Sequence, residues 1–278
     1  MQSDLIVQGP GATRTFAEGL VQSTGAASIE PIGPAAFRLT GGQISAAIAT
    51  LCAGAAVDVA IVPAVQRLAD FRLVALDMDS TLITIECIDE LADLVGKKAE
   101  IAAITAAAMR GELDYQGSLR QRVAALAGIE LAAVESVYTE RLQLSPGAEA
   151  LLERLRALGI KTLLVSGGFT FFTERLKQRL QLDFAQSNIL EIVDGRLTGS
   201  LIGDLVDGTR KAQIVAATAR QLGIAATQII AMGDGVNDLP MMAEAGVSIA
   251  YRAKPKVREQ ATYSFNYVGL DGLLNLFR

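Results

Sequence analysis

From Phe71 onward, short apolar runs alternate with longer stretches of helical periodicity, and this alternation narrows the choice of fold more than any other feature. The runs that we expect to form strands are Leu73 to Asp77, Ile160 to Ser166, Gln228 to Asp234 and Val247 to Ala250. Strands that alternate with helices along a chain form a parallel sheet with helices on both faces. The sequence therefore predicts a doubly wound α/β domain over residues 67–278.

A long insert separates the first two of these strands. It shows helical periodicity without a strand signal, and its expected helices are Ile88 to Val95, Ala99 to Met109, Ser118 to Ala127 and Leu131 to Arg141. Ligands of open α/β sheets bind at the carboxyl ends of the strands, so an insert at this point would lie over the ligand. We predict an α-helical cap at about residues 84–145 that excludes water during a reaction. A helical subdomain without a chemical role is the alternative.

Residues 1–66 carry none of the polar clusters found later, and they form a pattern of their own. The expected elements are a strand (Asp4 to Gln8), a helix (Arg14 to Ser23), two strands (Ala27 to Ile32 and Ala36 to Leu39), a helix (Gly42 to Ala53) and a strand (Val57 to Val62). This βαββαβ order is that of a ferredoxin-like α+β domain, and it resembles the amino-acid-binding regulatory domains known as ACT. Because a fold alone does not establish ligand binding, three roles stay open: structural support, formation of a homodimer, and sensing of an amino acid.

The stretch Ile189 to Ile202 has Asp194-Gly195 at its centre, which is a turn signal typical of a β-hairpin. We interpret this stretch as a peripheral ribbon that takes no part in the chemistry.

The composition excludes several classes of function. The formal net charge of the 278 residues is −5 and no long basic run occurs, so nucleic acid is not an expected partner. The absence of histidine removes Ser-His-Asp and Cys-His catalysis and imidazole metal sites. The two cysteines are far apart, and we expect both to be reduced. No stretch reads as a secretory signal or a membrane span, so the expected location is cytoplasmic, with no membrane partner.

Two carboxylates, Asp77 and Asp79, follow the first predicted strand at the point where it gives way to a loop. Side chains two residues apart in an extended segment point the same way, so both would face the ligand edge of the sheet. Because two anions held this close repel each other, a divalent cation is expected beside them, and Mg²⁺ suits a site built from oxygen alone. The pair indicates phosphate chemistry with a carboxylate nucleophile.

Three further polar clusters follow at expected strand ends or helix starts: Ser166-Gly167-Gly168, Lys211, and Gly233-Asp234-Gly235-Val236-Asn237-Asp238. A hydroxyl group and glycine amides at a helix N-terminus suit a phosphoryl group. A lysine at a helix start indicates a nearby anion, and acidic side chains at a second strand end would complete the oxygen shell of a cation. Each cluster has a structural alternative: a glycine turn, a solvated lysine, or an Asp-Gly turn with a helix cap.

In this order, the four clusters resemble the signature of the haloacid dehalogenase (HAD) superfamily of phosphohydrolases, from about Phe71 to the end of the chain. The resemblance implies that Asp77 is a nucleophile that forms an aspartyl-phosphate and that Asp79 is the general acid and then the general base. The phosphate-binding residues that it implies are Ser80, Ser166, Gly167, Lys211 and Asn237. The metal ligands that it implies are Asp77, the backbone carbonyl of Asp79, and Asp234, with Asp238 in a supporting position.

The insert narrows the resemblance to the phosphoserine phosphatases of the bacterial long-chain type. The matching stretches are Asp79-Ser80-Thr81-Leu82, Glu86 to Ala92 and Met109 to Val123. The likeness implies that Glu86 binds the ammonium group of the substrate and Arg122 its carboxylate. It also implies that Met109 and Tyr115 line the pocket, although Tyr115 stands where phenylalanine is expected. The implied function is hydrolysis of O-phospho-L-serine, the last step of serine biosynthesis. The alternatives are phosphothreonine, phosphohomoserine or another small phosphomonoester as substrate, or an amino-acid-sensing regulatory protein.

Overall fold

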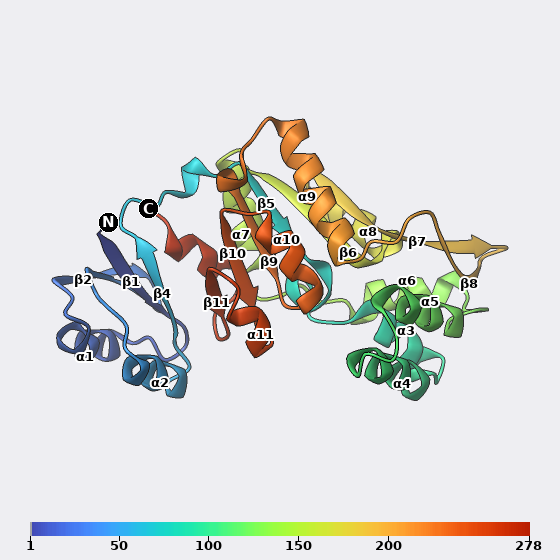
Figure 1. Cartoon of the computed structure of the whole chain (residues 1–278), viewed down its shortest axis with the longest axis horizontal. Helices are drawn as coiled ribbons and strands as arrows, with labels where there is room; N and C mark the ends of the chain where they lie inside the picture. The colour runs from blue at the N-terminus through green and yellow to red at the C-terminus, as the bar shows by residue number, and fades with distance from the viewer. Residues whose placement is uncertain (1) are drawn as a thin grey trace.

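The computed structural model of the chain describes residues 2–278, apart from the side chain of Met109. Three parts follow one another along the longest axis of the molecule (Figure 1). A small module built from the N-terminal residues lies at one end, a large α/β core forms the middle, and a group of helices inserted into the core lies at the other end. Among the described residues, no helix combines the length and the apolar character needed to cross a membrane.

A seven-stranded sheet in the order β11-β10-β9-β5-β6-β7-β8 forms the centre of the core. The strands are β5 (Leu73–Leu76), β6 (Lys161–Phe169), β7 (Phe184–Val193), β8 (Arg196–Ile202), β9 (Ile229–Gly233), β10 (Val247–Tyr251) and β11 (Tyr263–Phe265). All neighbours pair in parallel except β8, which runs antiparallel to β7 at the edge. The sequence predicted the four central strands, which are parallel, and β8 belongs to the stretch that was predicted to form a β-hairpin.

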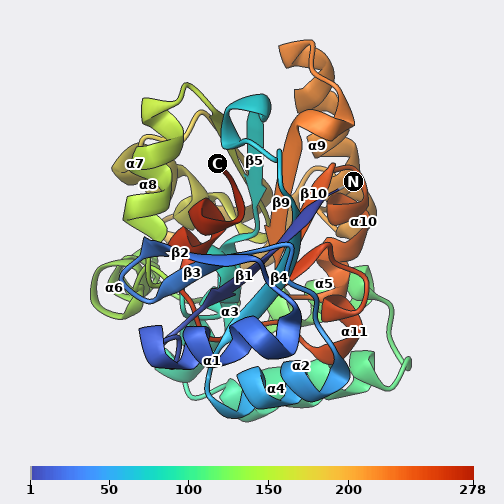
Figure 2. The same cartoon turned by 90° about the vertical axis from the view of Figure 1, so that its left-hand side faces the viewer.

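Helices cover both faces of this sheet, as the alternation of strands and helices predicts. On one side lie α7 (Ala148–Ala157) and α8 (Thr170–Leu180), and on the other α9 (Gly208–Leu222) and α10 (Leu239–Ala243), followed by α11 (Pro255–Arg258) (Figure 2). Successive side chains of β5 point to opposite faces, so Val74 joins one hydrophobic cluster and Ala75 the other. Because neither face meets water, every residue of β5 is buried and apolar, which explains why this strand is visible in the sequence.

The insert between β5 and β6 consists of α3 (Cys87–Leu94), α4 (Lys98–Met109), α5 (Tyr115–Ala125), α6 (Leu131–Ser136) and a π-helical turn (Val137–Arg141). Two linkers, residues 82–84 and 143–145, join it to the core, and we call them together the hinge. The linkers pair with each other through a bridge between Ile83 and Leu144. The amide of Thr84 donates to the carbonyl of Gln143 at 2.9 Å, and the amide of Ser145 donates to the carbonyl of Leu82 at 2.9 Å.

The hairpin of β7 and β8 has the predicted turn at Asp194 and lies at the edge of the sheet, where it also contacts the insert. Its tip pairs with the segment of the insert that joins α5 to α6. The amide of Gly128 donates to the carbonyl of Leu197 at 2.8 Å, and the amide of Leu131 donates to the carbonyl of Gly195 at 2.8 Å. The hairpin therefore supports the insert from the core side, a tertiary contact that a turn signal cannot reveal.

The N-terminal module follows the predicted order of elements. It contains β1 (Ser3–Gln8), α1 (Arg14–Thr24), β2 (Ser28–Gly33), β3 (Ala36–Thr40), α2 (Ala46–Gly54) and β4 (Asp58–Pro63). The strands form an antiparallel sheet in the order β2-β3-β1-β4. One face of this sheet packs on α1 and α2, whereas Ile6, Ala60 and Val62 on the other face belong to the main hydrophobic cluster of the core. The module is thus packed against the core by its open face.

Candidate active site

The polar clusters of the sequence meet at one edge of the central sheet. Asp77 follows β5, which lies between β6 and β9, and the amide of Asp77 still donates to the carbonyl of Met232 in β9 at 3.0 Å. Ser166 lies in the last part of β6, and Asp234 directly follows β9. Because the three strands run parallel, their carboxyl ends meet, and residues that are far apart in the sequence come together.

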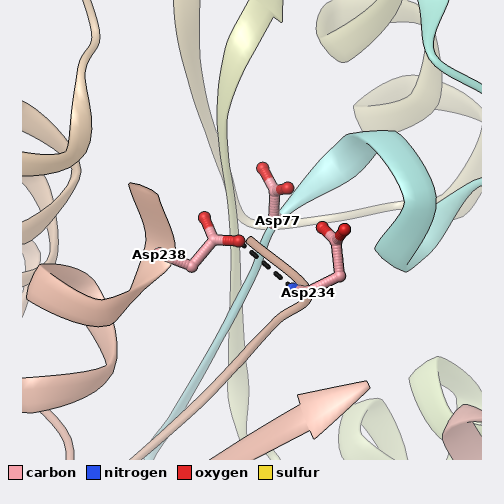
Figure 3. A group of neighbouring side chains, drawn as sticks. All are labelled: Asp77, Asp234 and Asp238. Atoms are coloured by element: carbon pink, nitrogen blue, oxygen red, sulfur yellow. Dashed lines mark hydrogen bonds between the residues drawn. The ribbon is translucent and has the colours of Figure 1, made fainter. Parts of the chain in front are cut away.

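Three carboxylates lie side by side at this edge (Figure 3). One oxygen each from Asp77, Asp234 and Asp238 lies within 4.8 Å of the other two. The Nζ atom of Lys211 lies 2.5 Å from Oδ1 of Asp77 and 2.7 Å from Oδ1 of Asp238. Lys211 is buried in the first turn of α9. One ammonium group cannot neutralise three carboxylates, so the group keeps a surplus of negative charge.

The pKa values of these groups reflect the same surplus of negative charge. Burial and the charge of Asp238 raise the pKa of Asp77 well above its ordinary value, against the opposing effect of Lys211. Burial and the charges of Asp238 and Glu86 raise the pKa of Asp234 to about 7. Burial would lower the pKa of Lys211, but the carboxylates of Asp238 and Asp77 raise it on balance. A divalent cation beside the carboxylates would reduce the repulsion between them. Their donor atoms are all oxygens, which suits a hard cation.

Asp238 differs from the other two carboxylates because both of its oxygens are already used. Its Oδ1 accepts from Lys211 and, at 3.4 Å, from the side-chain amide of Asn237. Its Oδ2 accepts from the backbone amides of Asp234 at 3.2 Å and Gly235 at 2.9 Å. Asp238 therefore orients Lys211 and the loop that carries Asp234.

Asp79 lies in a short irregular turn after the nucleophile candidate, beside Ser80, whose φ of 56° is left-handed. The Oδ1 atom of Asp79 accepts a hydrogen bond at 3.1 Å from the amide of Cys87, the first residue of α3. Burial and the charge of Glu86 raise the pKa of Asp79 to about 7. A carboxyl with this pKa can both give and take a proton near neutral pH, which is what general acid and base catalysis needs. Its side chain is not part of the three-carboxylate group.

The loop at Ser166 is tied to its surroundings by hydrogen bonds. Its hydroxyl accepts from the amide of Gly168 at 2.8 Å. The carbonyl of Gly167 accepts from the side chain of Asn188 at 2.7 Å, and Asn188 in turn accepts from the amide of Val206 at 2.8 Å. The sequence analysis missed Asn188, because its partners lie 21 and 18 residues away and nothing local marks them. This buried residue fixes the loop expected to bind phosphate.

The insert places further predicted residues over the carboxylates. The hydroxyl of Tyr115 lies so near Gly167 that a Cβ atom on that glycine would be 2.1 Å from it. The carboxylate of Glu86 accepts a hydrogen bond from the hydroxyl of Ser80 at 2.8 Å. The Nε atom of Arg122 is buried, and no hydrogen-bond partner for it occurs among the described residues. Met109 ends α4, and its side chain lies outside the described part of the structure.

The structure thus brings Asp77, Ser166, Lys211, Asp234, Asn237 and Asp238 together and sets Asp79, Ser80, Glu86, Tyr115 and Arg122 around them. The amide of Ser80 donates to the carbonyl of Ile85 at 3.3 Å, a hydrogen bond within the catalytic turn. The sequence analysis also missed Asp207, which caps α9 and accepts from Gln116 of the insert at 2.8 Å. Its place before a helical run is a cap signal that could have been recognised.

Comparison with known proteins agrees with this geometry. The model of the family described as haloacid dehalogenase-like hydrolase matches residues 74–243. A Polaromonas protein named phosphoserine phosphatase is 57% identical over 217 residues, which are 76% of this chain and 92% of that protein. A crystal structure of a HAD family hydrolase from Salmonella enterica aligns with a TM-score of 0.89 at 35% identity, covering 100% of this chain and 98% of that one.

A third similar protein is a structure described as a phospho-aspartyl intermediate analogue of phosphoserine phosphatase. It aligns with a TM-score of 0.70 at 36% identity and covers 75% of this chain and 99% of that one. The family match spans more than half of the chain and includes Asp77, Ser166, Lys211 and Asp234. The chain therefore belongs to the haloacid dehalogenase-like hydrolase family.

Proposed function

We propose that the protein is a phosphoserine phosphatase, which hydrolyses O-phospho-L-serine to L-serine and phosphate in the last step of serine biosynthesis. The observation that carries this proposal is the position of Asp77, whose carboxylate contacts Lys211 beside two further carboxylates, under an insert that presents Arg122. Relatives that are named phosphoserine phosphatase support the substrate.

We propose that Asp77, Asp234 and the backbone carbonyl of Asp79 hold Mg²⁺, with Asp238 orienting them. The support is the surplus of negative charge and the purely oxygen donor set. When bound, the ion neutralises charge on the phosphoryl oxygens and on the carboxylates. The remaining phosphoryl oxygens would contact Lys211, Asn237 and the loop residues Ser80, Ser166 and Gly167.

In the first step, an oxygen of Asp77 forms a bond to phosphorus while the bond from phosphorus to the serine oxygen breaks. Asp79 gives its proton to that oxygen, so L-serine leaves as the neutral alcohol and Asp77 carries the phosphoryl group. In the second step, the carboxylate of Asp79 takes a proton from water, whose oxygen bonds to phosphorus. The bond to Asp77 then breaks, phosphate leaves, and both side chains return to their starting states.

The insert would recognise the amino-acid part of the substrate. A phosphoamino acid carries an ammonium and a carboxylate, so its pocket needs one anion and one cation that can form two parallel hydrogen bonds. Glu86 is proposed to bind the ammonium group and Arg122 the carboxylate, with Tyr115 and Met109 as walls. The buried Nε of Arg122, which has no partner among the described residues, supports this role, because a buried donor without a partner is costly.

We further propose the domain organisation that the sequence predicts: a ferredoxin-like, ACT-like domain at residues 1–66 and a phosphatase domain at residues 67–278 with its cap at about 84–145. The order β2-β3-β1-β4 and the two helices on one face support the first part. A homodimer formed through the N-terminal domain stays a prediction, which light scattering on the purified protein tests. The cytoplasmic location likewise stays a prediction, which cell fractionation tests.

The direct test is turnover by the Asp77→Asn variant in the presence of Mg²⁺. We expect kcat for phosphoserine to fall by at least about 10³-fold, because the amide is a poor nucleophile, while the fold persists. Asp194→Asn in the exposed hairpin turn is the matched control and should keep wild-type activity. Activity of Asp77→Asn near the wild-type level would rule out the mechanism. A panel with phosphothreonine, phosphohomoserine and an aryl phosphate checks the substrate.

A further inference from the structure

The N-terminal module holds a segment near the end of the chain through a buried carboxylate. Asp58, the first residue of β4, is 4% exposed. Its two oxygens accept hydrogen bonds from the backbone amides of Asn266 at 2.8 Å, Tyr267 at 2.9 Å and Val268 at 3.1 Å, and from the side chain of Asn266 at 3.3 Å. Consecutive amides that converge on one carboxylate fix the backbone of that segment.

The same module holds the chain a few residues further on. The side chain of Asn275 donates to Gln8 at 2.7 Å, and the guanidinium of Arg38 donates to the carbonyls of Asn275 at 3.2 Å and Phe277 at 3.1 Å. Arg38 is buried and also contacts Asp4 at 3.3 Å. The stretch that includes these two attachments, residues 266–277, therefore starts and ends at points fixed to the module, and we call it the brace.

The brace lies directly against the hinge of the insert. The amide of Leu270 donates to the carbonyl of Pro146 at 2.8 Å. Gly269 approaches the same carbonyl so closely that a Cβ atom there would lie 2.5 Å from its oxygen. Pro146 follows the second linker of the hinge, so the brace fixes the point at which the insert rejoins the core.

The other linker of the hinge continues into the catalytic turn. The amide of Leu82 donates to the carbonyl of Asp77 at 3.3 Å, and the amide of Ile83 donates to the carbonyl of Met78 at 3.0 Å. Because the two linkers are hydrogen-bonded to each other, a shift at Pro146 would be transmitted to the turn that carries Asp77 and Asp79.

We propose that Asp58 is a positioning residue: through the brace, the N-terminal module fixes the hinge and thereby sets how the cap closes over phosphoserine. The kinetic part of this proposal rests on the proposed function. The module then has a role in turnover that needs no ligand of its own and no partner chain. The role follows from its packing on the core and from the hydrogen bonds of Asp58.

Two variants of the full-length protein test the brace: one weakens its contact with the module, and the other weakens its contact with Pro146. Asp58→Asn removes the charge that holds the three amides, and Gly269→Ala pushes the brace away from Pro146 without touching the module. Leu20→Ala is the matched control, because Leu20 is buried between α1 and the sheet and belongs to the cluster that does not face the core. This control destabilises the module but leaves Asp58 and the brace intact.

The first readout is amide hydrogen exchange at residues 82–84, 143–145 and 147. We expect exchange there to become at least about fivefold faster in Asp58→Asn and in Gly269→Ala, and to stay at the wild-type rate in Leu20→Ala. Unchanged exchange in both brace variants, or equally fast exchange in Leu20→Ala, would overturn the proposal. This readout does not depend on activity, so it decides the role of the brace even if the wild type fails to hydrolyse phosphoserine.

The second readout compares two substrates. An aryl phosphate has no ammonium or carboxylate for the cap to hold, so its turnover depends less on closure. In both brace variants we expect kcat/KM for phosphoserine to fall about tenfold and that for the aryl phosphate to change less than about twofold. An equal loss for both substrates would mean general damage and would contradict a role in cap closure.

Discussion

At Lys211, one ammonium group lies between two buried carboxylates, and the free energy of each of the three groups depends on the other two. The carboxylate of Asp77 needs a positive neighbour to stay ionised in a buried place, and Lys211 supplies part of that charge. Asp238 holds Lys211 in place with one oxygen and the loop of Asp234 with the other. These residues illustrate why single side chains in this site cannot be assigned independent energies.

Arg122 allows the sharpest test of substrate recognition at the scale of one residue. In Arg122→Ala we expect kcat/KM for phosphoserine to fall roughly a hundredfold, because the substrate carboxylate loses charged hydrogen bonds, while an aryl phosphate changes little. The matched control is Arg120→Ala, which removes an exposed arginine from the same helix and should change neither value. Equal losses for both substrates in Arg122→Ala would refute the assignment of this residue to the carboxylate.

At the scale of helices and strands, the sequence predicted the elements that are buried on all sides or that have a regular helical pattern. Buried strands such as β5 are continuous apolar runs, and the helices of the insert have a clear period, so their predicted limits lie within a few residues of the observed ones. The prediction did not extend to β11, which has three residues, or to the first half of β7, which precedes the predicted hairpin. For these strands, pairing with a neighbour matters more than local composition.

The contact between α5 and the loop after β6 predicts a coupled pair of substitutions. Gly167→Ala should lower kcat/KM for phosphoserine about 10- to 100-fold, because its methyl group would overlap the hydroxyl of Tyr115 and keep the cap from closing. Tyr115→Phe removes that hydroxyl, and the nearest ring atom would lie 3.4 Å from the new methyl group, an ordinary contact.

The double variant should therefore recover most of the activity lost in Gly167→Ala, whereas Tyr115→Phe alone should cost less than about threefold. The measurement is a double-mutant cycle on kcat/KM. Strict additivity of the two substitutions would show that the loss in Gly167→Ala has another cause, such as interference with the phosphoryl group.

At the scale of the whole molecule, the three parts form one connected structure. The module packs its open sheet face on the core, the hairpin of the core supports the insert, and the hinge lies between them. The insert is therefore held in place by the hairpin on one side and by the hinge on the other. The buried carboxylates at the centre lower the stability of the fold when they are ionised, so this stability should depend on the pH and on a bound cation.

Asp79 and Asp234 have a pKa of about 7 in the folded, metal-free protein, against an ordinary value of 3.8. A carboxyl whose pKa is higher in the folded state stabilises the fold at low pH, and this contribution is lost as the pH rises from 3.8 towards 7. The metal-free protein should thus lose stability over this range. A cation bound to the ionised carboxylates should offset the loss.

We therefore expect Mg²⁺ at about a hundred times its dissociation constant to raise Tm by roughly 5–10 °C at about pH 8 and by less than about 2 °C at about pH 5. Thermal unfolding with Mg²⁺ or with a chelator measures this difference. Asp234→Asn should reduce the gain at the higher pH. The same gain at both pH values would contradict a site made of these carboxylates.

The sequence by itself determined the alternation of strands and helices, the place of the insert and the positions of Asp77, Lys211 and Asp234. It could do so because buried strands need continuous apolar runs, and because ligand-binding residues must stand where such runs end. Only the tertiary structure decided the contact of the hairpin with the insert, the role of Asn188 and the contact of Asp58 with residues 266–268. These features join segments far apart in the chain, and hydrogen bonds between such segments leave no periodic or compositional trace in either one.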